Sequence, residues 1–149
     1  MFRGNHPVKI DEKGRLKMPA AFKATVDARN VKQFYITSIN GKTVQVWLLP
    51  DWEEQEKQVT GLGEMTTMVR NYLRLTSYYG QQVEIDNQGR LLMPQKLRTS
   101  AKLDNMEADV IGMGNFVEVH NHDELEQSLP VFTDDDSDKL AAAIRQQQH

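Results

Sequence analysis

Residues 11–19 read DEKGRLKMP and residues 86–94 read DNQGRLLMP, with Asp, Gly, Arg, Leu, Met and Pro at the same places in both. The match extends outward, because residues 8–19 and 83–94 agree at eight of twelve positions at a constant offset of 75. Two copies are too few for a stacked repeat array. The repeat therefore predicts two halves related by a pseudo-two-fold axis, each completing the core of the other.

One copy of the repeat can be interpreted from its residue types. Residues 8–10 alternate apolar, polar and apolar, as in a half-buried strand, and Asp11 can fold its carboxylate onto the backbone amides that follow. Gly14 supplies the backbone freedom that a tight turn needs, so we expect a positive φ at Gly14 or at its counterpart Gly89. A second strand follows, and Pro19 suits the first position of a short helix.

The remaining segments complete each half and connect the two. Each copy is followed by an apolar, β-rich run with a Gly-containing turn signal inside it, which predicts a hairpin. Between the halves, Met65, Met68, Val69, Tyr72 and Leu73 have the spacing of one apolar helix face. The pattern predicts an α+β fold with a first half at 1–53, connecting helices at 54–81, a second half at 82–128 and an acidic tail at 129–149 that could hold a short helix.

The net charge of −3 conceals a gradient along the chain. Residues 1–32 carry eight Lys and Arg against three Asp and Glu, whereas residues 104–149 carry two against eleven. An anionic partner would be attracted to the N-terminal region and repelled by the C-terminal one. Similar charge blocks also occur on solvated surfaces that bind nothing, so the charge pattern alone leaves both interpretations open.

Composition also bears on the compartment. The chain has no cysteine, and neither its first residues nor any later segment has the apolar run of a signal peptide or a membrane span. These features predict a cytoplasmic protein with no membrane partner.

The sequence gives little support to an enzymatic function. It lacks the motifs of phosphate-binding loops, dinucleotide-binding turns and zinc peptidases, and it has no cysteine nucleophile. His120 and His122 form the one ligand-like pair, but the matching segment of the first half has no histidine. Asp11 and Asp86 each precede a Gly turn and an Arg, which suits a turn anchor better than an acid–base pair. We therefore expect no catalytic residue, cofactor, metal or small-molecule substrate.

Several segments together resemble one family of bacterial regulators. These are the opening MFRG, the DEKGR and DNQGR loops, LPDWEE, and VRNYLRLTSYYG. They resemble the MraZ family over residues 1 to about 129. The resemblance implies an AbrB-like, swapped-hairpin β-barrel made from two tandem halves with intervening helices. It also implies ring-shaped homo-oligomers in the nucleoid that bind short tandem promoter repeats, mainly repressing the division and cell-wall gene cluster and their own promoter.

With that resemblance, the two repeated loops become the predicted site for double-stranded DNA. Arginine matches the O6 and N7 edge of guanine and also phosphate, and nearby lysines would position the loop on the backbone. The second loop should attract DNA less, because Gln88 and Leu92 replace Lys13 and Lys17. The predicted DNA-binding residues are Arg3, Lys9, Lys13, Gly14, Arg15, Lys17, Asn87, Gln88, Gly89 and Arg90, with Asp11 and Asp86 orienting the loops.

Two other functions stay open at this point. AbrB-like folds also serve as antitoxins whose tails occupy a partner protein, and here Val131 and Phe132 are the apolar anchors that such a tail would offer. A small hydrolase built on the histidine pair is the other alternative.

Overall fold

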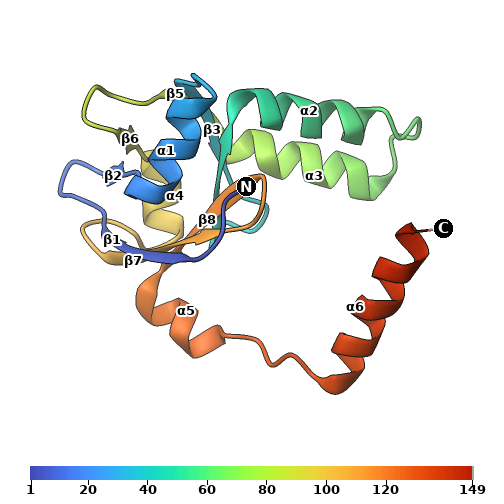
Figure 1. Cartoon of the computed structure of the whole chain (residues 1–149). Helices are drawn as coiled ribbons and strands as arrows, with labels where there is room; N and C mark the ends of the chain where they lie inside the picture. Colours follow the sequence, from blue (N-terminus) through green and yellow to red (C-terminus); the bar gives the residue numbers. More distant parts are fainter. Residues whose placement is uncertain (149) are drawn as a thin grey trace.

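The computed structural model describes residues 1–148 and places matching elements in the two halves (Figure 1). The first half contains β1 (Asn5–Lys9), β2 (Arg15–Lys17), α1 (Ala20–Ala28), β3 (Gln33–Thr37) and β4 (Val44–Leu48). The second contains β5 (Gln81–Glu84), β6 (Arg90–Leu92), α4 (Gln95–Ser100), β7 (Glu107–Gly112) and β8 (Phe116–Asn121). The remaining helices are α2 (Leu49–Thr60) and α3 (Thr67–Tyr78) between the halves, then α5 (His122–Ser128) and α6 (Asp134–Gln147).

The strands of the two halves are exchanged. β1 pairs with β7 of the second half, and β5 pairs in the same antiparallel sense with β3 of the first. β4 and β8 join these pairs into a six-stranded sheet with the order β1-β7-β8-β4-β3-β5, while β2 and β6 form a separate two-stranded ribbon. In that ribbon Leu16 lies opposite Leu91, which is its own counterpart at the offset of 75. The pairing therefore has the pattern of a two-fold repeat.

The sheets are not closed into the barrel that the family resemblance implies. Within residues 1–148, the edge strands β1 and β5 pair with neither each other nor the ribbon. The chain leaves β1 at Ile10 and meets β2 through one main-chain bond, from the Asp11 N–H to the Arg15 carbonyl at 3.1 Å. Because that bond does not continue as a ladder, the six-stranded sheet and the ribbon stay separate.

Equivalent positions of the two copies supply the core between the sheet and the ribbon. Each of the pairs Leu16 and Leu91, Met18 and Met93, and Phe22 and Leu97 is buried. Burying one such side chain stabilises a fold by roughly 1.5–3 kcal/mol relative to leaving it exposed. The repeated residues are therefore needed to form the shared core as well as the two loops.

Helices α2 and α3 form a hairpin that packs on β3 and β4 at one end and projects beyond the sheet at the other (Figure 1). At the packed end Trp52 stacks on Tyr35 with ring centroids 4.8 Å apart. The apolar residues predicted to share one helix face are only partly buried: Val69 of α3 is buried, but Met68 of α3 and Met65 just before it are 72% and 50% exposed. Within residues 1–148, the projecting end has nothing to pack these two methionines against.

Helix α6 lies apart from the sheet (Figure 1). Helix α6 begins with a capping box between Thr133 and Asp136, and none of its described residues is buried. In residues 1–148, no helix combines the length and apolar character needed to cross a bilayer.

Candidate nucleic-acid interface

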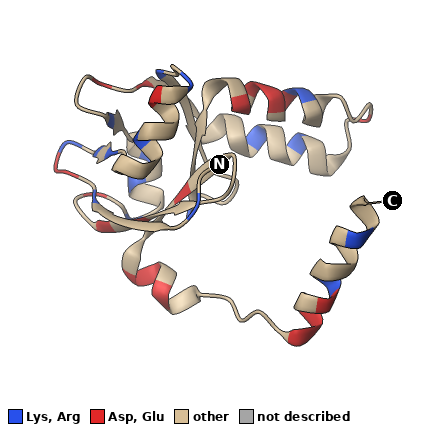
Figure 2. Cartoon of the chain, in the orientation of Figure 1, with Lys and Arg blue, Asp and Glu red and all other residues tan. Residues whose placement is uncertain are grey.

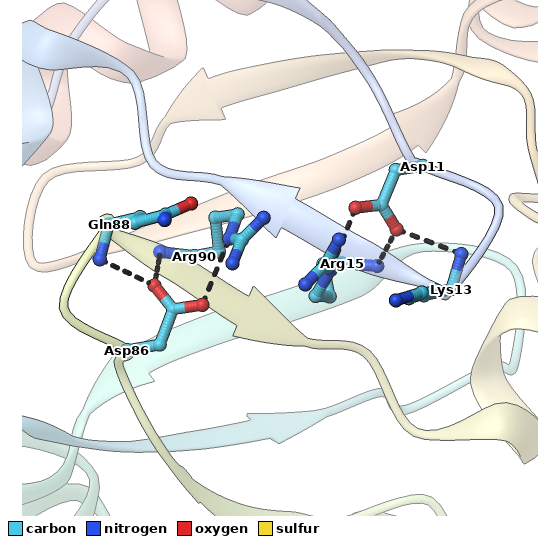
Figure 3. A network of polar contacts seen from close by, with 6 residues as sticks. All are labelled: Asp11, Lys13, Arg15, Asp86, Gln88 and Arg90. Carbon is cyan, nitrogen blue, oxygen red and sulfur yellow. Dashed lines mark hydrogen bonds and ion pairs between the residues drawn. The ribbon is translucent and has the colours of Figure 1, made fainter.

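The first loop, residues 11–15, is held by the carboxylate of Asp11. Its Oδ1 accepts the main-chain N–H of Lys13 at 3.0 Å and of Arg15 at 2.8 Å. Its Oδ2 accepts the Arg15 Nε–H at 2.8 Å (Figure 3). A single carboxylate therefore fixes both the turn and the direction of the guanidinium that follows it.

The second loop, residues 86–90, repeats this arrangement. Asp86 Oδ1 accepts the main-chain N–H of Gln88 and of Arg90, both at 2.9 Å, and Oδ2 accepts the Arg90 Nε–H at 2.9 Å. Gly14 and Gly89 have φ of 83° and 77°, a backbone region that costs other residues about 1–2 kcal/mol. The prediction of a positive φ in this turn is confirmed at both glycines.

The ribbon presents one face to solvent and one to the core. Leu16 and Leu91 are fully buried beneath it. Because side chains alternate along a strand, the four remaining side chains share the outward face. The cross-strand partners on this ribbon face are Arg15 with Leu92 and Lys17 with Arg90. Three of the four ribbon-face residues are therefore cations.

The pairing of Lys17 with Arg90 is unfavourable for the isolated fold, because like charges directly opposite each other destabilise a sheet. Asp11 and Asp86 offset part of the charge through one Nε each. Within residues 1–148, neither arginine donates a hydrogen bond from its Nη atoms to another protein group. These Nη donors and the Lys17 ammonium are available to an anionic or acceptor-rich ligand.

Each loop is also held by the opposite half. The Met18 N–H donates to the Gly89 carbonyl and the Met93 N–H to the Gly14 carbonyl, both at 2.9 Å. The Arg98 guanidinium lies against Gly14 and leaves no space for a Cβ there. At the second loop Lys23, the counterpart of Arg98, takes this position with its Cε 3.3 Å from where a Gly89 Cβ would lie. Each half therefore helps to fix the position of the loop that belongs to the other half.

Arg98 was missing from the predicted site. Its Nε donates to the Met93 carbonyl at 3.0 Å and its Nη1 to Asp104 at 3.1 Å, so its charge is partly neutralised where it covers Gly14. The offset of 75 that pairs Arg98 with Lys23 is the signal that could have found it.

Both loop carboxylates are charged at neutral pH. The hydrogen bond from the Arg15 main-chain N–H, with further bonds from the Arg15 side chain and Lys13, lowers the pKa of Asp11 below 3.8. The matching bond from Arg90 lowers the pKa of Asp86 in the same way.

Figure 2 shows Asp and Glu gathered on α5 and at the start of α6, whereas the ribbon carries Arg and Lys.

The other predicted site residues fall at different distances from the loops. Lys13, Asn87 and Gln88 are exposed within the loops themselves, and Lys9 is exposed at the loop end of β1. Arg3 precedes the opposite end of β1, where its backbone lies against Gly112. Lys9 therefore lies at the end of β1 from which the first loop begins, opposite Glu107, and Arg3 lies beyond the other end of β1.

The two histidines bind neighbouring carboxylates. His120 Nε2 lies 3.0 Å from Glu118, and His122 Nδ1 lies 2.7 Å from the buried Asp109. The hydrogen bond to Asp109 raises the pKa of His122 above its ordinary value of 6.5. Within residues 1–148, no group of three or more His, Asp or Glu side chains could hold a metal ion.

Comparisons with known proteins agree over most of the chain. A family model described as "MraZ protein, putative antitoxin-like" matches residues 1–75 and 80–146. A transcriptional regulator MraZ of Acidobacterium capsulatum is 43% identical, covering 95% of this chain and 97% of the relative. The corresponding regulators of Koribacter versatilis and Thiobacillus denitrificans are 39% and 32% identical, covering 95% and 81% of this chain.

Proposed function

Because this chain belongs to the MraZ family of transcriptional regulators, which are not enzymes, we propose that it binds double-stranded DNA through the ribbon face and its two loops. In this proposal Arg15 and Arg90 contact base edges, and Lys13, Lys17 and Lys9 contact phosphates. Asn87 and Gln88 offer amide contacts, and Arg3 has at most a peripheral part. Asp11, Asp86, Gly14 and Gly89 set the direction of the two arginines.

The observation that carries the proposal is the ribbon face. A two-stranded β-ribbon fits the major groove of B-DNA, where guanine presents O6 and N7 to a bidentate arginine. The Asp bond to each Nε holds Arg15 and Arg90 in loops of the same conformation and, within residues 1–148, leaves their Nη donors without a protein acceptor. The repulsion between Lys17 and Arg90 would also be relieved by a phosphate or a guanine edge.

The assembly in this proposal is a homo-oligomeric ring in which several ribbons bind tandem promoter repeats. Leu62, Met65 and Met68 leave an exposed apolar surface at the projecting end of the α2–α3 hairpin, which suits contact with another copy. Tethering several weak sites raises the effective concentration of each, so an acidic chain can still hold DNA. The proposed targets are the division and cell-wall gene cluster and the chain's own promoter, mainly repressed, and the proposed location is the cytoplasm and nucleoid.

A second candidate function is an antitoxin-like interaction with a partner protein. The family description carries that term, and Val131 and Phe132 are 83% and 67% exposed between α5 and α6. In this alternative Phe132→Ser would abolish capture of the partner and leave DNA binding intact.

Footprinting on the DNA upstream of the chain's own gene tests the proposal. We expect wild-type protein to protect short repeated elements with regular spacing, and a folded Arg15→Ala variant to protect none at the same concentration. Absence of any sequence-specific protection by the wild-type protein would contradict the proposal.

A further inference from the structure

Leu92 occupies an unexpected place for an exposed aliphatic side chain. It is 53% exposed on the ribbon face, directly opposite Arg15 and two residues after Arg90 on the same strand. Cross-strand neighbours on one face have Cβ atoms about 4.5–5.5 Å apart, so Leu92 lies among cations. A single exposed leucine needs no explanation elsewhere on a surface, but here it stands within the proposed DNA contact.

The counterpart of Leu92 in the other half is Lys17. Both residues follow their arginine by two positions and both point outward from the ribbon. The backbone around them is nearly two-fold, since Leu16 and Leu91 pair with each other beneath the face. The ribbon is therefore close to symmetric in shape and asymmetric in chemistry, with a cation at one end and an aliphatic side chain at the other.

An aliphatic side chain in the major groove has one complementary base feature. Guanine, cytosine and adenine present only hydrogen-bond donors and acceptors there, whereas thymine presents the C5-methyl group beside its O4 acceptor. Leucine can make no hydrogen bond, so it gains only by covering that methyl and loses by facing a polar edge. The spacing between successive bases on one strand is about 3.4 Å, which allows Arg15 and Leu92 to reach neighbouring base pairs.

We propose that Leu92 is a specificity-determining residue that contacts the methyl group of a thymine beside the guanine contacted by Arg15. The inference rests on the proposed DNA-binding function. At the other end of the face, Lys17 and Arg90 favour guanine or phosphate. A nearly two-fold ribbon would otherwise bind its element in either direction, and this difference fixes one direction for every copy in a ring.

Deoxyuridine provides the test, because it removes only the C5-methyl group from thymine. Duplexes selected from a random pool by the wild-type protein are resynthesised with deoxyuridine at each thymine in turn, and their affinity is measured by fluorescence anisotropy. We expect one position in the element at which the wild-type protein loses about fourfold in affinity, the effect of one buried methyl-sized group. The folded Leu92→Ala variant should bind more weakly and show no change at that position.

Lys17 supplies the matched controls. Lys17→Ala should weaken binding to every duplex alike and keep the deoxyuridine effect. It should also make the negative slope of log affinity against log salt less steep by about 1. Leu92→Lys should lose the deoxyuridine effect and make that slope steeper by about 1. Circular dichroism and thermal melting establish that the variants are folded, which the exposure of both side chains favours.

The outcomes separate the inference from the function on which it rests. Specific binding by the wild-type protein that is indifferent to deoxyuridine at every position would overturn the role of Leu92 and leave DNA binding standing. A deoxyuridine effect that persists in Leu92→Ala would assign the methyl contact to another residue. Failure to select any sequence from the pool would overturn both proposals.

Discussion

The loop at residues 11–15 and the loop at residues 86–90 have the same backbone and different surroundings. In both, an aspartate accepts two main-chain N–H groups and one arginine Nε, and a glycine adopts a positive φ. The first loop carries Lys13 and is covered by Arg98, whereas the second carries Gln88 and is approached by Lys23. Positions that the geometry requires are repeated, and positions that the geometry leaves free have diverged.

The largest effect is expected at the arginines, where the two loops are most alike. Arg15→Ala and Arg90→Ala should each fold as the wild-type protein does and each lose about 1–3 kcal/mol of specific DNA binding per guanine contact. In a ring the loss is repeated in every subunit, so Arg15→Ala should remove most specific binding. Anisotropy with a specific and a random duplex measures the effect, and melting curves serve as the control. Unchanged affinity in either folded variant would break the equivalence of the loops.

Substituting the glycine of each loop should lower the stability of the protein to different extents. Ala at either position places a side chain in the left-handed region, at a cost of about 1–2 kcal/mol. At Gly14 the new methyl group also meets the Arg98 guanidinium, whereas at Gly89 it meets the flexible Lys23 side chain at 3.3 Å. Urea denaturation should therefore show a larger loss of unfolding free energy for Gly14→Ala than for Gly89→Ala.

A double variant checks the cause of that difference. Adding Arg98→Ala to Gly14→Ala should recover part of the lost unfolding free energy, and adding Lys23→Ala to Gly89→Ala should recover less. Equal losses of unfolding free energy at the two glycines, with no recovery in either double variant, would contradict this explanation. The Arg98 side chain would then move aside at no cost, and the two loops would tolerate a Cβ equally.

Exchanging the divergent loop residues should have a smaller effect on binding than removing either arginine, and the effect should appear in the salt dependence. Lys13→Gln removes one phosphate partner and should reduce the slope of log affinity against log salt by about 1, while Gln88→Lys should raise it by about 1. Affinity for different sequences should shift nearly uniformly, because phosphate contacts carry no sequence information. A change in base preference with an unchanged salt slope would assign Lys13 a role in base recognition.

The smallest expected effect concerns pH, and in this property the loops should agree. Hydrogen bonds from Arg15 and Arg90 lower the pKa of Asp11 and Asp86 below 3.8. A carboxylate whose pKa is lower in the folded than in the unfolded protein stabilises the fold at any pH above its unfolded-state pKa. That contribution is lost as the pH falls through its folded-state pKa. We expect both carboxyl groups to titrate below pH 3.8 by NMR, so that their own contribution to stability is lost only in that acidic range. A carboxyl group that titrates above pH 3.8 in either loop would show that its hydrogen bonds are not maintained in solution.

Local geometry was the part of this molecule that the sequence could predict. The Asp turn and the positive φ at Gly14 and Gly89 depend on residues within the same short loop, so the repeat carries the information for both. The contact of Arg98 with Gly14 depends on how the halves pair, and no local pattern encodes it.

Two other outcomes have the same physical origin. Arg3 is near the first loop in sequence, but β1 is extended at about 3.3 Å per residue and carries the chain away from it. Met68 has the spacing of a buried helix face, yet periodicity states which residues share a face and not what covers it. The exchange of β1 and β5 between halves and the proposed ring were expectations from the family resemblance rather than from spacing.

The central claim is that DNA lies against the ribbon and its two loops, and site-specific cross-linking tests it directly. The chain has no cysteine, so a single introduced cysteine carries a photoactivatable cross-linker at one known position. The loop variants are Lys13→Cys and Gln88→Cys, and the controls are Leu140→Cys and Ile144→Cys on α6, at residues that are 53% and 50% exposed. We predict DNA adducts from both loop variants and none from the controls. Adducts from the Leu140 or Ile144 position, with none from either loop, would contradict the account.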